Sequence, residues 1–272
     1  MVLPRSLWDF VRSFGDEGGF AELRGWRFEF VSARFNVRPS VSDLSSICPT
    51  RRDVFLRRVY SLRIESEAML FGRLVHEAFL YPIRGILRGL DVESVIARFR
   101  GYIRSAPVRY RRILWNVFEK GLEHAIVAKV DGLPISIEPL IPASPIGLSD
   151  YVKPDLLVGF IPVEITTSTN NERKEVSLTA YAMAIEAWTG HPVDYAVLTH
   201  ITINGGVRIN WRVVRVNDSL RRRFLDIRDS IAKMIEYNQD PGIAEECPSS
   251  CPFIEVCKGG GLPSGAGIKG TR

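Results

Sequence analysis

Apolar residues in the first 130 positions recur at helical spacing. A long helix is predicted over residues 66–87, where they return about every third or fourth position. Serines that could cap a helix precede a shorter periodic stretch, so another helix is expected to begin near Ser42. Two further helical stretches cover residues 91–103 and 108–130. The N-terminal part therefore predicts a layer of helices.

After residue 130 the pattern changes to short apolar runs typical of strands. One run alternates apolar and polar positions, and two others follow so closely that they indicate a hairpin or neighbouring strands. Gly190 is placed to end a helix, and Gly205 and Gly206 separate two strong strands. The predicted elements are strands 133–141, 153–160 and 161–167, helix 174–190, strands 192–203 and 207–216, and amphipathic helix 218–238.

This order of elements predicts an α/β fold with a mixed sheet, preceded by a helical layer. We expect a helical region over residues 1–130, a sheet-containing core over 131–240 and a cysteine-bearing segment over 241–258. The last residues, 259–272, offer almost no core-forming side chains, so we expect a disordered tail there.

The composition indicates where the protein is located and what kind of partner it binds. Of the 272 residues 46% are hydrophobic and 25% charged, as in folded proteins generally. The chain lacks both an apolar run of membrane-spanning length and the pattern of a signal peptide, so a cytoplasmic protein is expected. The net charge of +5 favours a polyanionic partner, although basic surfaces also occur in proteins that never touch nucleic acid. Gln239 is the only glutamine, and a low content of thermolabile amide side chains is consistent with a thermophilic source.

The four cysteines are distributed as one plus three. Cys48 stands alone, and about 200 residues later come Cys247, Cys251 and Cys257. Disulfides are unusual in the cytoplasm, outside hyperthermophiles, so metal binding becomes the favoured use. Four thiolates can hold Zn²⁺, a [2Fe–2S] cluster or a [4Fe–4S] cluster, and a disulfide pair or unconnected buried thiols remain as alternatives. Such a site would join the two ends of the chain.

Two carboxylates occupy neighbouring predicted strands, Asp155 at the start of one and Glu164 within the next. They could converge on Mg²⁺ or Mn²⁺, which prefer oxygen ligands, or they could be a turn residue and an edge-strand charge. His76 lies on the long predicted helix, where a lone histidine is more often structural. Gly72 lies one turn earlier, and a glycine inside a helix can mark the close approach of another backbone.

Four features in this order resemble the RecB-type branch of the PD-(D/E)xK nucleases. They are a GxxxH helix ending at His76, a PD strand at Asp155, a strand with Glu164, and a helix with SLTAY ending at Tyr181. Together with the cysteines, they resemble the CRISPR-associated RecB-like nucleases that carry an iron–sulfur cluster. The stretches CPTRRDVFLRRV and GLSDYVKPDLLVG are similar to the archaeal variant branch of that family.

The resemblance implies a restriction-endonuclease-like mixed central sheet flanked by helices, with a subdomain that binds the cluster. It implies that His76, Asp155 and Glu164 bind the catalytic Mn²⁺ or Mg²⁺, and Ile165 also belongs to this implied metal set. For the four cysteines it favours [4Fe–4S]. It further implies cleavage of single-stranded DNA ends, which trims prespacers before integration, alongside CRISPR integrase and other acquisition proteins.

The chain departs from the family pattern where a lysine is expected two residues after the glutamate. Thr166 occupies that position, and a hydroxyl cannot balance charge on the reacting phosphate. Lys174, near the start of the next helix, could supply the missing charge; Lys153 is another candidate, and a solvated charge run is the simpler interpretation of Lys174. Ser177 stands where the family has a glutamine. Either a lysine has migrated, or the site binds DNA and cuts slowly or not at all.

Basic and aromatic residues supply candidates for DNA contact. Arg51 and Arg52 follow Cys48 and could grip phosphates, and Tyr181 completes the predicted DNA-binding set. The basic run 221–223 is expected to face solvent or a protein partner. Three hypotheses therefore stand: a metal-dependent nuclease with an iron–sulfur cluster, a non-cleaving DNA-binding or scaffolding subunit, and a zinc-stapled regulator.

Overall fold

The structure is a computed structural model of the chain and describes residues 21–168 and 171–259. The tail predicted to be disordered lies almost wholly outside these residues. The helices are α2 (Phe28–Val31), α3 (Val41–Leu44), α4 (Arg52–Val59), α5 (Glu67–Leu87), α6 (Val92–Ile103), α7 (Val108–Val130), the 3₁₀ turn η1 (Ser144–Ile146), α8 (Asn171–Thr189), α9 (Asp218–Glu236) and α10 (Ile254–Lys258). The strands are β1 (Ile135–Ile137), β2 (Ile141–Pro142), β3 (Tyr151–Val152), β4 (Leu156–Val158), β5 (Ile161–Thr166), β6 (Tyr195–Ile203) and β7 (Val207–Arg215).

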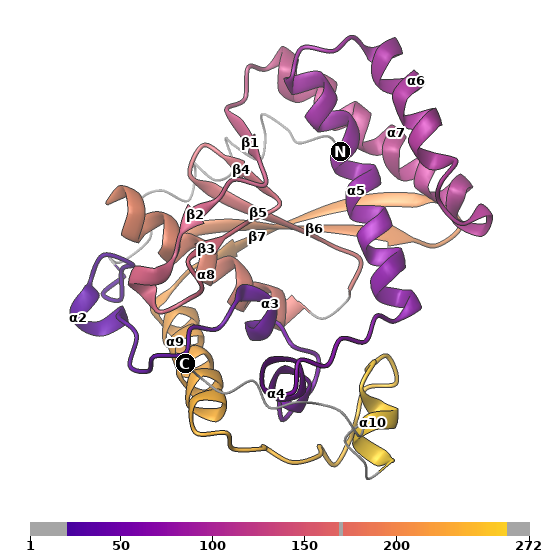
Figure 1. The fold of residues 1–272 in the computed structure, drawn as a ribbon. Coiled ribbons are helices and arrows are strands. Elements are labelled where there is room, and N and C mark those ends of the chain that lie inside the picture. The colour runs from indigo at the N-terminus through magenta and orange to yellow at the C-terminus, as the bar shows by residue number, and fades with distance from the viewer. Residues whose placement is uncertain (1–20, 169–170, 260–272) are drawn as a thin grey trace.

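The main sheet in the described residues has five strands in the order β1-β4-β5-β6-β7 (Figure 1). β4 and β5 form an antiparallel hairpin, and so do β6 and β7. β5 and β6 run parallel, and α8 makes the crossover between them. β2 and β3 form a separate two-stranded sheet. The prediction of a mixed α/β sheet is confirmed.

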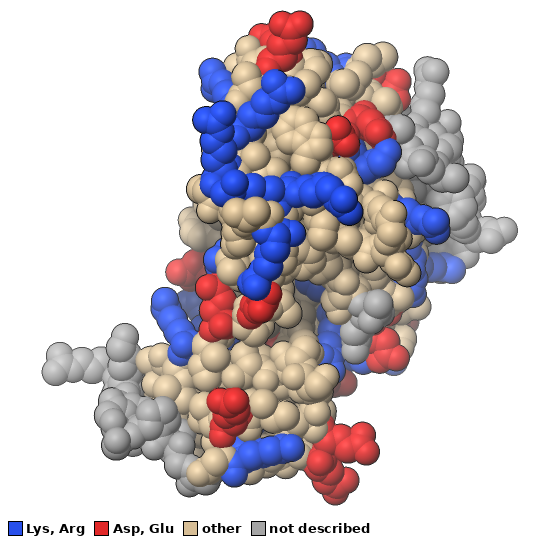
Figure 2. All heavy atoms as spheres, turned by 90° about the vertical axis from the view of Figure 1, so that its right-hand side faces the viewer, with Lys and Arg blue, Asp and Glu red and all other residues tan. Residues whose placement is uncertain are grey.

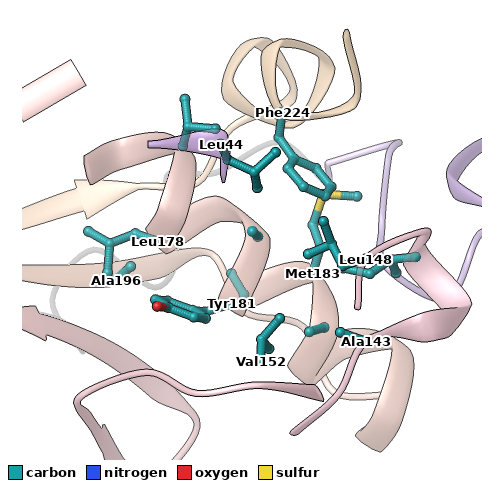
Figure 3. Close-up of a cluster of buried hydrophobic side chains, with 14 of the residues drawn as sticks. Leu44, Ala143, Leu148, Val152, Leu178, Tyr181, Met183, Ala196 and Phe224 are labelled. Carbon is teal, nitrogen blue, oxygen red and sulfur yellow. The ribbon is translucent and has the colours of Figure 1, made fainter. Parts of the chain in front are cut away.

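Each face of the sheet carries its own hydrophobic core. On one face α5, α6 and α7 pack against alternate strand residues such as Val163 and Ile165. On the other face α8 and α9 enclose Ala196, Leu198 and the residues shown in Figure 3. This alternation follows from the two-residue repeat of a strand. α5, α6 and α7 therefore share a core with one face of the sheet, and α2, α3 and α4 contribute to the core on the other face.

Local sequence signals determine where α5, the helix that carries His76, begins and how it packs. The Ser66 side chain accepts a hydrogen bond from the Met69 amide and caps the start of α5. α7 then approaches α5 so closely that a Cβ on Gly121 would lie 2.2 Å from the Phe79 carbonyl oxygen. Only glycine permits this contact, and it holds α5 firmly in the layer beside the sheet.

Several predicted elements differ from those observed. The helix expected near Ser42 is two short helices, because α3 ends after one turn and α4 begins only beyond Pro49. The strand predicted over 133–141 is broken at Glu138, whose φ of 47° is incompatible with a regular strand. α8 begins at Asn171, so Lys174 lies within its first turn and not at its start.

The prediction that residues 221–223 face solvent or a partner is wrong for Arg221. Its side chain is completely buried and makes two contacts with Glu186, at 2.6 and 2.9 Å. Arg24 joins the same carboxylate at 2.8 Å, so a buried ionic cluster links α9 and α8 to the segment before α2. No helix within 21–168 or 171–259 combines the length and apolar character needed to cross a membrane.

Candidate metal site and cysteine cluster

The three residues predicted to bind a catalytic metal come from three elements that meet at one end of the β4–β5 hairpin. Leu156 pairs with Val163, so the register sets Asp155 opposite Glu164. The two-residue turn of this hairpin contains Gly159, whose φ of 59° favours glycine. His76 reaches the same place from α5. The structure therefore brings together side chains that lie up to 88 positions apart in the sequence (164 − 76).

The two carboxylates are held in different ways. Asp155 Oδ2 accepts a hydrogen bond of 2.6 Å from the amide of Ile165, and Oδ1 lies 2.7 Å from His76 Nε2. The angles of the contact between His76 Nε2 and Asp155 Oδ1 do not fit a hydrogen bond. Both His76 Nε2 and Glu164 Oε2 are buried without a hydrogen-bond partner among the described residues. Buried polar atoms of this kind are costly unless a further group satisfies them.

These residues line an open pocket of about 480 Å³. Gly72 also lines it, and a Cβ at Gly72 would find its nearest neighbour, Thr167 Oγ1, 3.8 Å away. The prediction that Gly72 marks a close backbone approach is therefore wrong, because a methyl group would fit. Gly72 instead leaves space at the pocket wall beside His76. The other lining residues include Met69, Arg73, Thr166, Thr167, Ser168 and Lys174.

Of the two lysines considered in place of Thr166, only Lys174 reaches the carboxylates. Its Nζ lies 2.7 Å from Glu164 Oε1. Lys153 instead pairs with Glu138 at 2.9 Å. Thr166 is buried, and its hydroxyl accepts a hydrogen bond from the Ser168 amide at 3.0 Å. The interpretation of Lys174 as a solvated charge is wrong, because its ammonium group is half-buried in an ion pair.

Burial and charge shift the proton affinities in this pocket. Burial and the neighbouring Asp155 raise the pKa of Glu164, and Lys174 and His76 oppose this only in part. Burial alone would lower the pKa of Lys174, but the two carboxylates outweigh it and raise that pKa. The pKa of His76 is raised by Asp155 in spite of burial. The crowded carboxylates thus disfavour the ionised form of Glu164, and an added cation would relieve this.

Tyr181 lies behind Glu164 in the core, where Figure 3 shows its ring among the side chains of α8 and the sheet. It is 6% exposed, so the structure does not place its ring on a surface where DNA bases could stack. Burial and the nearby carboxylates raise its pKa well above the usual value and keep the phenol neutral. Ser177, in the place of the family's glutamine, is buried in the same helix.

The donor set fits a hard divalent cation. One imidazole nitrogen and two carboxylates, with Glu164 Oε2 unpartnered, are the ligand types that Mg²⁺ and Mn²⁺ accept. As the side chains stand, no group of three or more His, Cys, Asp or Glu among residues 21–168 and 171–259 is arranged to hold a metal ion. The fit is thus one of chemistry and proximity.

The segments that carry the cysteines lie at the same end of the molecule, where α4 follows Cys48 and α10 contains Cys257 (Figure 1). Leu56 of α4 packs in one small cluster with Cys251, Phe253 and Cys257. Two polar contacts run alongside. Thr50 Oγ1 donates to the Gly242 carbonyl at 2.9 Å, and Arg52 pairs with Asp240. The predicted meeting of the two chain ends is therefore present in the fold.

Arg52 makes a two-pronged ion pair with Asp240, with hydrogen bonds of 2.8, 2.9 and 3.1 Å. Arg51 adopts a left-handed backbone conformation, with φ of 62°, and donates to the Leu44 carbonyl at 3.1 Å. Both arginines of the predicted DNA-binding set are thus engaged within the protein. Arg57 and Arg58, further along α4, contact the buried Asp43.

All four thiols are free of disulfides, and three are buried. Burial raises the pKa of Cys251 and of Cys257, and the charges of other cysteine thiols, Cys48 among them, add to the increase. Arg52 opposes this at Cys257. Such a group fits a cofactor that binds thiolates, since bound metal would compensate their mutual repulsion.

Glu138 is a residue of the site that the sequence did not reveal. Its amide donates to the Asp155 carbonyl at 3.0 Å, and its carboxylate contacts Arg84 at 3.0 Å and Lys153 at 2.9 Å. It also contributes to the electrostatics of His76. The one local signal was its place before Pro139, which restricts the preceding residue.

Comparisons with known proteins define first a class and then a family. Two curated relatives are both named CRISPR-associated exonuclease Csa1. The protein from Saccharolobus solfataricus is 28% identical over 271 residues, covering 87% of this chain and 91% of its own length. The protein from Thermoproteus tenax is 27% identical over 261 residues, with the same coverage. This chain is thus similar to proteins that are named as exonucleases.

The sequence profile of the CRISPR-associated exonuclease Csa1 family matches residues 1–100 and 92–261, so this chain belongs to that family. Among solved structures, an alkaline exonuclease, LHK-Exo from Laribacter hongkongensis, aligns with 73% of this chain and 93% of its own. It is 11% identical with a TM-score of 0.27, too low a likeness to support a structural argument.

Proposed function

We propose that this chain is a metal-dependent DNA exonuclease that trims single-stranded DNA ends during CRISPR spacer acquisition. Membership of a family named for CRISPR-associated exonucleases supports the class of reaction. The observation that carries the proposal is the convergence of His76, Asp155 and Glu164 in one open pocket, with buried atoms that lack partners. The proposed substrate is a DNA end, the proposed product a trimmed prespacer, and the proposed partners are the CRISPR integrase and other acquisition proteins.

His76, Asp155 and Glu164 would hold Mn²⁺ or Mg²⁺, with Ile165 beside them. Bound there, such an ion would polarise the phosphodiester and lower the pKa of a coordinated water. The chain's own contribution is to fix these groups. The Ile165 amide orients Asp155 through its 2.6 Å hydrogen bond, and the hairpin register sets Glu164 opposite. Binding requires an unprotonated His76 Nε2 and an ionised Glu164, and a nearby cation favours both states.

Lys174 would take the place of the lysine missing at Thr166. Its ammonium group is directed to Glu164 Oε1 and lies on the wall of the same pocket. From there it favours the ionised form of Glu164, against the effect of burial and of Asp155, and would present positive charge towards a phosphate in the pocket. Tyr181 would act from the core as a buried neutral phenol near Glu164.

The proposal extends to the fold and to a second cofactor. We interpret the mixed sheet and its helices as a restriction-endonuclease-like core of RecB type. The segment that carries Cys247, Cys251 and Cys257 would join Cys48 in a subdomain that binds an iron–sulfur cluster, with [4Fe–4S] the preferred form. Three buried thiols in one neighbourhood support this cofactor. The cluster would stabilise the fold and would stand apart from the chemistry of the pocket.

A second candidate function is a DNA-binding or scaffolding subunit that cuts weakly or not at all. The observation in its favour is Thr166, which is buried and committed to the Ser168 amide where the family pattern has a lysine. In this alternative, Lys174 serves only to neutralise Glu164.

Cleavage of labelled single-stranded DNA with Mn²⁺, by wild-type protein and by Asp155→Asn, tests the proposal. We expect the variant to cut at least about 10²-fold more slowly, the usual cost of removing a group that stabilises transition-state charge. Asp150→Asn is the matched control, because Asp150 is exposed and pairs only with Arg38. Equal rates for wild type and Asp155→Asn would overturn the nuclease proposal, and DNA binding without cleavage by wild type would favour the second candidate.

A further inference from the structure

A second cavity lies between α5 and α6, and three arginine side chains contribute to its lining. Its volume is about 350 Å³. Arg84, Arg88 and Arg98 surround it, with Tyr81 on one wall and Gly85 and Val95 where the helices meet. None of these residues lines the acidic pocket. The cavity is therefore a separate feature of the helical layer.

The charges around this cavity do not cancel. Arg84 is held by Glu77 at 2.7 Å and by Glu138 at 3.0 Å. Arg88 and Arg98 are exposed, and neither forms an ion pair with any residue that the structure describes. Two guanidinium groups thus remain available at the edge of the cavity. The planar guanidinium group can donate to two oxygens of one phosphate at the same time.

The walls of the cavity are fixed by tight packing. A Cβ added to Gly85 would lie 2.7 Å from Val95 Cγ2, so the two helices touch at this point. α5 then ends with Leu90 donating to the Gly85 carbonyl at 3.1 Å, and Gly89 takes the φ of 88° that this turn requires. Backbone positions for the arginines are therefore set before any ligand arrives, which lowers the entropy lost on binding.

The cavity is connected to the acidic pocket through Arg84. This arginine contacts Glu138, whose amide donates to the carbonyl of Asp155. Along α5, Arg84 and Arg88 lie about 12 and 18 Å from His76 at a rise of 1.5 Å per residue, a span of a few nucleotides. Figure 2 shows Lys and Arg side chains gathered over the upper part of this face of the molecule.

We propose that this arginine pocket, formed by Arg84, Arg88 and Arg98, binds a backbone phosphate of the DNA strand a few nucleotides from the bond that is cut. The inference rests on the proposed function and adds a contact that positions the substrate. Because phosphates carry no sequence information, the pocket contributes affinity and register for any sequence. Arg88 and Arg98 supply the free charges, and Arg84 links the pocket to the strand that carries Asp155.

The test is DNA binding at several salt concentrations, in EDTA so that nothing is cut. The variant Arg88→Ala/Arg98→Ala is compared with wild type on two single-stranded oligonucleotides of unrelated sequence. We expect affinity to fall about tenfold for both, and the slope of log K against log salt to decrease by about 1. With Mn²⁺ we expect KM to rise and kcat to stay within about twofold, because neither arginine reaches the acidic pocket.

The matched control is Arg222→Ala/Lys233→Ala, which removes the same charge from exposed positions of α9, on the opposite face of the sheet. Arg88→Lys/Arg98→Lys should restore part of the affinity. A salt slope unchanged in the pocket variant, or reduced equally in the control, would overturn the inference while leaving metal-dependent cleavage by wild type intact. A loss confined to oligonucleotides with a terminal phosphate would also overturn it, because the pocket would then bind a chain end.

Discussion

The acidic pocket takes His76, Asp155 and Glu164 from a long helix and a strand hairpin that share one core, whereas the cysteine cluster takes its residues from loops and short helices near the two ends of the described chain. The pocket's geometry follows from packing that exists without any cofactor. Cys251 and Cys257 pack in one small apolar group with Leu56, and this arrangement depends on contacts between segments about 200 residues apart. This difference predicts that loss of a cofactor would unfold one region and merely inactivate the other.

The largest effect is expected from Cys251→Ser, which removes a buried thiol from the cluster. A site that closes a loop of about 200 residues contributes about 5 kcal/mol in the chain-entropy model, so the melting temperature and iron content should both fall. Iron analysis, visible absorption and thermal unfolding measure these effects on protein prepared without air. By contrast, Asp155→Asn should keep its iron.

Ser250→Ala is the matched control, since Ser250 is exposed in the same loop. If wild-type protein contained zinc and no iron, the cysteines would form a zinc site and the iron–sulfur proposal would be wrong. If Cys251→Ser instead kept the metal and the stability of wild type, the cluster itself would have to be abandoned.

A smaller effect, confined to the pocket, is expected from Lys174→Met. If Lys174 supplies the charge missing at Thr166, the rate of DNA cleavage with Mn²⁺ should fall about 10²-fold, within the range for loss of a positioned catalytic group. Lys174→Arg should retain more activity than Lys174→Met, because it keeps the charge near Glu164. Single-turnover kinetics at saturating DNA separate this effect from weaker binding.

Lys153→Met is the control, because Lys153 pairs with Glu138 and not with Glu164. Thermal unfolding of each variant is needed as well. Loss of Lys174 leaves Glu164 buried beside Asp155, and its pKa would rise further without the ammonium group. Full activity of Lys174→Met would show that Lys174 has no catalytic part and that the charge is supplied elsewhere.

The sequence was most informative where a single element carries the signal. The apolar repeat of α5 predicted that helix, and the short apolar runs around Asp155 and Glu164 predicted neighbouring strands, because local periodicity decides such elements. The meeting of His76 with the two carboxylates was implied only by the family resemblance. The partner of Lys174 depends on how α8 packs against β5, which no local pattern contains. The same holds for Glu138 and for the buried pair of Arg221 with Glu186, where tertiary packing turned an apparently solvent-facing arginine inwards.

Arg52 shows how far this extends, since its partner Asp240 is 188 residues away and the basic run around it indicated DNA instead. Substitutions in this pair should have the smallest effect of those considered, and they test whether the cysteine-bearing segments are joined without the proposed cofactor. In a double-mutant cycle with Arg52→Ala and Asp240→Asn, we expect a coupling of up to about 1 kcal/mol, as for other partly exposed ion pairs with good geometry. Thermal unfolding of the four proteins provides the measurement.

The Arg38–Asp150 pair is the control cycle, because it is more exposed, makes a single contact of 3.0 Å and lies outside the cluster. Its coupling should be close to zero. If Arg52 and Asp240 are coupled, the two chain ends are joined by side chains as well as by the proposed cofactor, and the cluster region would begin to form before the cluster binds. Zero coupling would mean that the ion pair does not help to hold the two segments together. A measurement of DNA binding by Arg52→Ala would then decide whether Arg52 contacts nucleic acid.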